Sequence, residues 1–431
     1  NIYEPLIKAD EDFNMESCLA VSWGLLNDNL WEFNLRRDVK FHDGSYFDAN
    51  DVVHSINVAK SESSGFEMND LLSNVKDVRA IDTYTVEIET VRPDPILLSK
   101  LSMIYMISSA SDGNYNDFIN GTGPYKYYSY DDSDLLVLNS FAEYWGGDVG
   151  FSTVSIVGIP EKNDRVRYFL DYGDILSYVP YDVLSQFEES SVEMYSVSSL
   201  EVQSLVFNFK SRIFYDVGMR RAFRDIVDGE DFSKNIGGYA HGINQFVSKG
   251  VFGYNSRIKN DSQSISLSDV NEKLGGKKIK VALPYGLEVL GEYISERLSS
   301  VGASADIEYI KSEYFVDVLN KMNFDVYFLG FKSDLGDAGD FLKSVAHTKS
   351  GDYGRYNFGN YSNKYLDDYV EKQEITMDES KRLSYLQEAM RILVEDDVFG
   401  VPLIEYDTFF AVKPWASFSP RIDGFIYLND L

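Results

Sequence analysis

The sequence is poor in the residues on which metal, redox and nucleic-acid sites depend. Cys18 is the single cysteine among 431 residues, so neither an intrachain disulfide nor a cysteine-rich zinc site can form. Lys and Arg number 40 against 69 Asp and Glu, which gives a formal net charge of −29. Because a surface of this sign repels phosphate backbones and no basic stripe offsets it, we expect no nucleic-acid partner.

Long apolar runs are also missing. No stretch approaches 18 apolar residues, so the sequence contains no candidate membrane span. The opening residues, NIYEPLIKAD, lack a basic region followed by an apolar stretch, and we expect any secretory signal to have been removed or never present. Apolar residues still make up 44% of the chain, which is enough for packed cores, and the length indicates two or three domains.

No motif predicts catalysis. The sequence has no G-x-S-x-G elbow, no H-E-x-x-H zinc motif and no P-loop. No neighbour pattern marks any of the four histidines as a general base: His42, His54, His241 and His347. We therefore expect no catalytic residue, no cofactor and no metal. His347 is the alternative as a metal ligand, because it follows an acidic segment.

Local patterns predict the first elements. Residues 30–41 alternate apolar and polar side chains, as in Trp31, Phe33 and Leu35, which is typical of a half-buried strand continuing to residue 41. Asp43-Gly44 supplies a turn, and Asn50 is a plausible N-cap for the helix that follows. Later in the chain, Ser362 is the expected cap of a helix over 363–373.

The stretch from residue 279 to 331 alternates strand and helix patterns, ending in the apolar strand DVYFLGF. This alternation is the signature of a parallel sheet with crossover helices. One of the helices has four leucine or isoleucine side chains directed inward: Leu287, Leu290, Ile294 and Leu298. Ligands of open α/β sheets bind beyond the carboxyl ends of the strands. Three carboxylates, Asp334, Asp337 and Asp340, directly follow the last strand and are candidate ligand-binding groups.

The chain resembles family 5 extracellular solute-binding proteins, the dipeptide, oligopeptide and nickel-type binding components of ABC importers. The resemblance rests on motifs that occur in the family's order over essentially the whole chain. They are IYEPL at Ile2, residues 19–56, GTGPYK to EYWGG (121–147), 166–176, 207–223, FGYN (252–255), 356–373 and VPLIEYDTFFAV (401–412). Within them, Trp23, Trp145, Gly121 and Pro124 are expected to serve packing and turns.

The resemblance implies an α/β fold of two lobes joined by a hinge, the type II periplasmic-binding-protein fold. One lobe comprises residues 1–204 plus 404–431, with an inserted subdomain at about 10–150, and the other comprises 205–403. Family members usually begin with several tens of residues, including a first strand, before the motif at Ile2. Such residues do not precede Ile2 in this sequence, and we expect that part to have been cut away or to be supplied otherwise.

The resemblance also implies a ligand site. In peptide-binding members, an Asp in a G-W-x-x-D segment pairs with the α-ammonium of the peptide. The matching segment here is Gly330-Phe331-Lys332-Ser333-Asp334, in which Phe331 replaces the Trp. We expect Asp334, with Phe331, Ser333 and Asp337 beside it, to bind ligand. The alternative for Asp334 is a helix-capping or solvated loop residue.

One difference between this chain and the family pattern bears on the kind of ligand that it binds. Dipeptide-type members carry an Arg after the strand that corresponds to IKVAL, where it pairs with the peptide carboxylate. This chain has Pro284-Tyr285-Gly286 there, so Tyr285 is a candidate contact and a peptide held at both ends is disfavoured.

The predicted function is that of a periplasmic or cell-surface solute-binding protein, with a lipid anchor as an alternative form of attachment. It is expected to be a monomer that delivers a peptide to the membrane permease of an ABC importer. The alternative cargoes are nickel chelates, oligosaccharides and opine-like compounds. A signalling or chaperone role on the same fold, and a hydrolase that uses Asp334 and Asp337, are the alternatives of other classes.

Overall fold

The computed structural model describes residues 1–61, 71–111, 119–131, 134–187, 191–237, 239–259, 266–321 and 323–431. The chain divides into two compact units. Unit 1 comprises Asn1–Val197 and Phe409–Leu431, and unit 2 comprises Ser198–Thr408. Both boundaries fall inside long strands, β11 (Glu193–Phe207) and β16 (Gly400–Val412). Among the described residues, no helix is both long and apolar enough to cross a membrane.

Unit 1 contains small antiparallel sheets. The strands are β1 (Ile7–Ala9), β2 (Met15–Ser17), β3 (Ala20–Asn27), β4 (Leu30–Leu35), β5 (Val75–Asp82), β6 (Thr85–Thr90), β7 (Tyr125–Tyr130), β8 (Leu135–Ser140), β9 (Thr153–Val157) and β10 (Ile175–Leu176). The helices are α1 (Ala49–Ala59), α3 (Leu97–Ser102) and α4 (Lys162–Tyr172), with short 3₁₀ turns at Ser109–Ser111, Tyr181–Phe187 and Leu428–Asp430. The strand orders are β1-β2, β3-β4-β6-β5 and β7-β8-β9, and β10 pairs with the end of β16.

The first predicted strand is confirmed and is shorter than expected. Trp31, Phe33 and Leu35 are buried on one face of β4, but the strand ends at Leu35 and does not continue to residue 41. The predicted cap of the next helix was wrong. The N-cap of α1 is Asp48, whose side chain accepts a hydrogen bond from the Asn50 backbone N–H and forms a capping box.

Unit 2 is built around a larger sheet. Its helices are α5 (Val217–Arg224), α6 (Gly229–Asn235), α7 (Leu267–Leu274), α8 (Glu288–Ser299), α9 (Ser312–Asn320), α10 (Ala338–Phe341), α11 (Lys364–Glu374) and α12 (Glu379–Arg391). Its further strands are β12 (Ala240–Gly242), β13 (Lys278–Pro284), β14 (Ser304–Ile310) and β15 (Val326–Lys332). π-helical turns at Leu342–Ala346 and Ile392–Asp396 extend α10 and α12.

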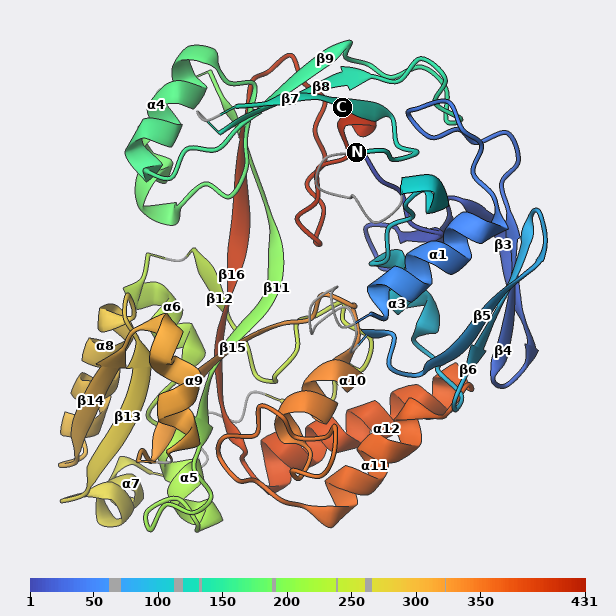
Figure 1. Ribbon diagram of the computed structural model, residues 1–431. Coiled ribbons are helices and arrows are strands. Elements are labelled where there is room, and N and C mark those ends of the chain that lie inside the picture. Colours follow the sequence, from blue (N-terminus) through green and yellow to red (C-terminus); the bar gives the residue numbers. More distant parts are fainter. Residues whose placement is uncertain are drawn as a thin grey trace. The chain divides into compact units, whose positions relative to one another are not determined.

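The sheet of unit 2 is mixed. Its order is β16-β11-β15-β13-β14, with β12 paired to β16. β13 runs parallel to both β14 and β15, which confirms the parallel pattern predicted from residues 279–331. β11 runs antiparallel to β15, so the start of its unit 2 part lies beside the carboxyl end of β15. α8 and α9 lie beside β13 and β14 (Figure 1).

The core of unit 2 forms where the helices cover this sheet. Leu290, Ile294 and Leu298 on α8 are buried, as predicted, against Val281 and Leu283 of β13 and their neighbours. Leu287 is the N-cap residue of α8 and is only partly buried. Burial of a Leu or Ile side chain contributes roughly 1.5–3 kcal/mol, so this face holds the helix against the sheet.

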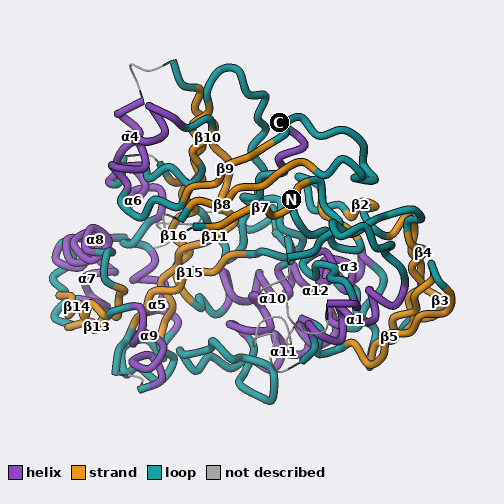
Figure 2. The backbone as a smooth tube through the Cα atoms, turned by 45° about the horizontal axis from the view of Figure 1, so that its top comes forward, coloured by secondary structure: helices purple, strands orange, loops and turns teal. Residues whose placement is uncertain are grey.

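α11 and α12 lie side by side near α10 (Figure 2). The predicted cap of α11 was wrong by one residue. Asn363 is the N-cap, and its side-chain oxygen accepts hydrogen bonds from the backbone N–H groups of Tyr365 and Leu366. Leu386 and Met390 of α12 are buried, whereas Leu383 is only partly buried.

Candidate functional site

Three strands of unit 2 end at one edge of the sheet. Because β13 is parallel to β14 and β15, the residues that follow these strands lie at a common carboxyl edge. Tyr285 follows β13, and its backbone N–H donates to the carbonyl of Ile310 at the end of β14, at 3.0 Å. Asp334 follows β15 by two residues. Both side chains are exposed, but β15 continues past the level at which β13 ends, so Tyr285 and Asp334 lie at different levels along the strands.

Asp334 carries an ammonium partner from its own segment. Lys332 Nζ lies 3.0 Å from Asp334 Oδ1, and the two side chains are 38% and 57% exposed. A pair this open to water contributes little to stability, on the order of 0.2–1 kcal/mol, because solvent screens it. Asp334 caps none of the helices that the structure describes, whereas Asp337 caps α10 by accepting a hydrogen bond from the Gly339 N–H.

A second carboxylate belongs to the same edge. Glu201 on β11 is directly opposite Lys332 on β15, and side chains in such pairs project from the same face. A Cβ on Gly330 would lie 2.7 Å from Glu201 Oε1, so the carboxylate occupies space that the glycine leaves free. Partial burial raises the pKa of Glu201, Lys332 lowers it and Asp334 raises it. Lys332 and Asp334 therefore both act electrostatically on the Glu201 carboxylate.

Phe331 alternates with Lys332 along β15 and so projects from the other face of the strand, and Ser333 directly follows the strand. The Phe331 ring meets Phe341 of α10 edge-on, with 5.2 Å between ring centroids. Ser333 is 2% exposed, and its backbone N–H donates to the carbonyl of Leu200. These contacts fix the backbone from which Asp334 projects.

Asp337 is a buried structural residue. Arg382 of α12 donates from Nη1 to Asp337 Oδ2 at 2.6 Å and from Nη2 to Oδ1 at 2.7 Å. The Gly339 N–H also donates to Oδ1, at 2.7 Å. With the carboxylate 5% exposed and both oxygens engaged, Asp337 anchors α10 to α12. Of the two carboxylates, Asp334 is the one that is accessible.

The ring of Tyr309 lies beside that of Tyr285 at this edge of the sheet. The rings of Tyr285 and Tyr309 are 6.5 Å apart between centroids and inclined by 33°. Gly286 takes a φ of +93°, a left-handed conformation that lets the chain turn into α8. No cation lies in the segment 284–286.

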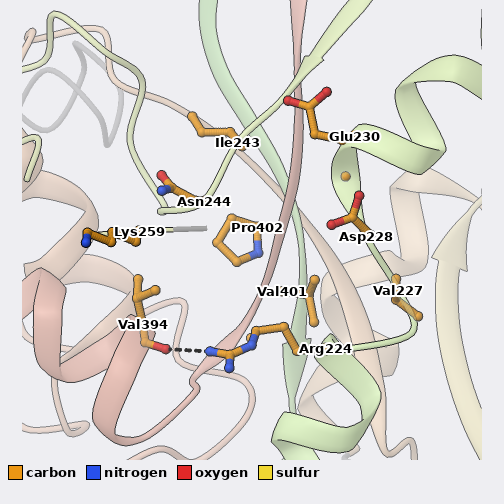
Figure 3. Close-up of a pocket in the computed structure, with 12 residues that line it drawn as sticks. Arg224, Val227, Asp228, Glu230, Ile243, Asn244, Lys259, Val394, Val401 and Pro402 are labelled. Carbon is orange, nitrogen blue, oxygen red and sulfur yellow. Dashed lines mark hydrogen bonds between the residues drawn. The ribbon is translucent and has the colours of Figure 1, made fainter. Parts of the chain in front are cut away.

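Two pockets of unit 2 lie away from Asp334 and Tyr285. One has a volume of about 40 Å³ and is lined by Arg224, Asp228, Glu230, Asn244 and Lys259, among others (Figure 3). Arg224 Nη1 donates to the carbonyl of Val394 beside it. This volume suits water molecules rather than a peptide. The other, of about 340 Å³, lies along α12 and is lined by Arg257, Gln387 and Arg391 among others. Neither is lined by Asp334 or Tyr285.

Two of the histidines, His42 and His347, lie in buried or partly buried surroundings. His42 Nε2 lies 2.9 Å from the Gly123 carbonyl, and the Gly121 N–H donates to Nδ1 at 3.3 Å. Burial of the ring is the main cause that lowers the pKa of His42 to about 4. His347 is buried, stacks on Tyr353 and places Nδ1 2.7 Å from the Thr348 carbonyl. Within the described residues, no group of three or more His, Cys, Asp or Glu side chains could hold a metal ion.

Two of the motif residues expected to be scaffold, Gly121 and Trp145, have packing roles. A Cβ on Gly121 would lie 2.0 Å from the carbonyl oxygen of Ile2, so only glycine fits there. Trp145 Nε1 donates to the buried carboxylate of Glu4 at 2.9 Å, and Arg36 stacks on the Trp145 ring. These contacts tie the first motif of the chain to the third.

Comparison with solved structures defines the class of protein. The periplasmic binding protein DppA of Helicobacter pylori, solved in complex with the peptide STSA, superposes with a TM-score of 0.76. It is 21% identical, and the match covers 96% of this chain and 88% of that one. The fold is thus that of the type II periplasmic binding proteins.

The sequence places the chain within this class. Residues 14–353 match the bacterial extracellular solute-binding proteins, family 5 (middle region), and the chain belongs to this family. The dipeptide-binding protein of Escherichia coli K12 is 22% identical over 422 residues, covering 87% of this chain and 78% of that protein. The nickel-binding protein NikA of Staphylococcus aureus is 25% identical over 413 residues, covering 91% and 81%.

Proposed function

We propose that this protein binds a peptide outside the cytoplasm and delivers it to the membrane permease of an ABC importer, with Asp334 as the anchor of the peptide's α-ammonium. One observation carries this proposal. The Asp334 carboxylate stands exposed at the carboxyl edge of the sheet and already holds a primary ammonium, that of Lys332, at 3.0 Å. That group is chemically equivalent to the amino terminus of a peptide. A carboxylate is required there because a desolvated ammonium is costly without a nearby opposite charge.

The other residues of the segment support the anchor. Phe331 and Ser333 fix the strand end through Phe341 and the Leu200 carbonyl, and Asp337 fixes the next helix through Arg382. Tyr285 offers a ring at the place where dipeptide-type members have a cation. The carboxyl end of the ligand is therefore held by no charge at Tyr285, which favours peptides longer than two residues.

Identification of the bound solute tests the proposal. The protein would be purified from its native source, and the small molecules released on denaturation would be identified by mass spectrometry. Peptides with free amino termini are the expected result. Calorimetry with the tetrapeptide Ser-Thr-Ser-Ala, a nickel–histidine chelate and an oligosaccharide then compares the cargo classes on one preparation. Binding of the chelate or the oligosaccharide without binding of peptides would contradict the peptide proposal.

The same proposal includes that the protein binds peptides without cleaving them. Family and fold are those of solute-binding proteins, and we expect peptides to be returned intact after incubation. Chromatography of the incubated peptide measures this. Cleavage that disappears in Asp334→Ala or Asp337→Ala would instead support a hydrolase.

A further inference from the structure

Lys332, the ion-pair partner of Asp334, occupies the place that a ligand's ammonium would take. If the carboxylate binds a ligand's ammonium, the ammonium of Lys332 stands in the way, 3.0 Å from Oδ1. Lys332 is therefore an internal analogue of the ligand group. An incoming ammonium has to share Asp334 with it or displace it.

Displacement is feasible because the pair is open to solvent. The Lys332 and Asp334 side chains are 38% and 57% exposed, so solvent screens their attraction and the pair is weak. A lysine stem is long and flexible, so its ammonium can move by several ångströms without a change in the backbone. The Lys332–Asp334 ion pair is therefore weak and can be broken, and it is not a fixed part of the scaffold.

Lys332 has a second carboxylate within its reach. Glu201 is directly opposite it across the β11–β15 pair, on the same face of the sheet. The absence of a side chain at Gly330 leaves room for the Glu201 carboxylate over the strand. Partial burial penalises the charged form of Glu201, and approach of the Lys332 ammonium offsets that penalty.

We infer that Lys332 is an internal competitor that sets the affinity and the charge specificity of the ligand site, passing from Asp334 to Glu201 when a ligand ammonium binds. The inference rests on the proposed role of Asp334. Two carboxylates and one lysine give the cluster a charge of −1, so a single ligand ammonium makes it neutral. The cluster therefore selects ligands with one primary ammonium at the anchoring end and disfavours ligands that have no cation to displace the lysine.

Three variants and a matched control test this inference by calorimetry with Ser-Thr-Ser-Ala and its N-acetyl form. Lys332→Met keeps the apolar stem and removes the competitor, so it should bind the free peptide about two- to fivefold more tightly. It should leave affinity for the acetylated peptide unchanged. Glu201→Gln removes the alternative partner and should weaken free-peptide binding by about the same factor, with no effect once Lys332→Met is present.

A control variant distinguishes competition by Lys332 from the effect of a change in the net charge of the protein. Lys278→Met removes a lysine that pairs with Asp306 at 3.1 Å, at the opposite end of β13. It changes the charge of the protein as Lys332→Met does, and it should leave both affinities unchanged. An equal gain in Lys278→Met, or an equal gain for the acetylated peptide, would overturn the competitor role of Lys332.

Asp334→Asn distinguishes failure of the inference from failure of the proposed function. If Asp334→Asn weakens binding while Lys332→Met does not strengthen it, the anchor stands and the competitor is refuted. If Asp334→Asn has no effect, or if the wild type and all variants fail to bind the free peptide, both are refuted. If both hold, Lys332→Met should gain nothing in the Asp334→Asn background.

Discussion

Arg382 and Asp337 form a buried bidentate ion pair that joins α12 to the segment after β15. Removing the charge of one partner should destabilise the fold, because the other charge is then left unpaired in the interior. We expect Asp337→Asn to lower the free energy of unfolding by about 3 kcal/mol. Urea denaturation measures this.

Asp368→Asn is the matched control for that variant. Asp368 pairs with Lys372 one turn away on α11, and both side chains are about half exposed. Its loss should leave the free energy of unfolding nearly unchanged, because solvent screens the pair. Equal effects of the two substitutions would contradict the structural role of the Asp337–Arg382 pair.

Helix α1 offers a test of its cap. Asp48→Ala removes the side chain that accepts from the Asn50 N–H, and it should destabilise the protein by about 1 kcal/mol. Asn50→Ala should have little effect, since Asn50 contributes its backbone N–H to the cap. Thermal unfolding of both variants measures the loss of stability in each. A larger loss in Asn50→Ala than in Asp48→Ala would support Asn50 as the N-cap, as predicted from the sequence.

Gly229 at the start of α6 is a site of close packing. A Cβ there would lie 1.8 Å from the carbonyl oxygen of Leu403, a backbone atom that cannot move alone. Gly229→Ala should therefore destabilise the protein by about 1–3 kcal/mol. A Cβ on Gly24 would meet no atom within 4 Å, so Gly24→Ala should be tolerated in the same assay. Equal stability of the two variants would refute the close approach.

His42 should make stability depend on pH. Its pKa is lowered to about 4 in the folded protein, against an ordinary 6.5, so the unfolded chain binds the proton more readily. The contribution of the neutral ring is complete above pH 6.5 and is lost as the pH falls toward 4. His42→Gln should flatten the slope of unfolding free energy against pH in this window. An unchanged slope in His42→Gln would contradict a buried, neutral His42 ring.

The strands and helices around the candidate site could be predicted because their signals are local. The apolar strand over residues 325–331 and the inward face of α8 follow from the periodicity of their side chains, and both are confirmed. The N-caps at Asp48 and Asn363 were missed by one or two residues. Polar residues able to cap are clustered there, and tertiary packing decides among them.

The partners of the site could not be predicted, because they come from distant parts of the chain. Glu201 reaches Lys332 only through the pairing of β11 with β15, and Arg382 reaches Asp337 only through the packing of α12. No spacing in the sequence signals either contact. The position of Asp334 at the strand end was predicted correctly, whereas its role as an anchor stays a prediction.

That role is the central claim, and calorimetry of four combinations tests it most directly. The combinations are the wild type and Asp334→Asn, each with a free and an N-acetylated peptide. Each change alone should cost roughly 2–5 kcal/mol, because it removes one partner of a charge pair that the ligand buries. Together they should cost little more than either alone, since both remove the same pair. Amidation of the peptide's carboxyl end should matter little. If acetylation leaves wild-type affinity unchanged, or if the two costs simply add, Asp334 is not the ammonium anchor.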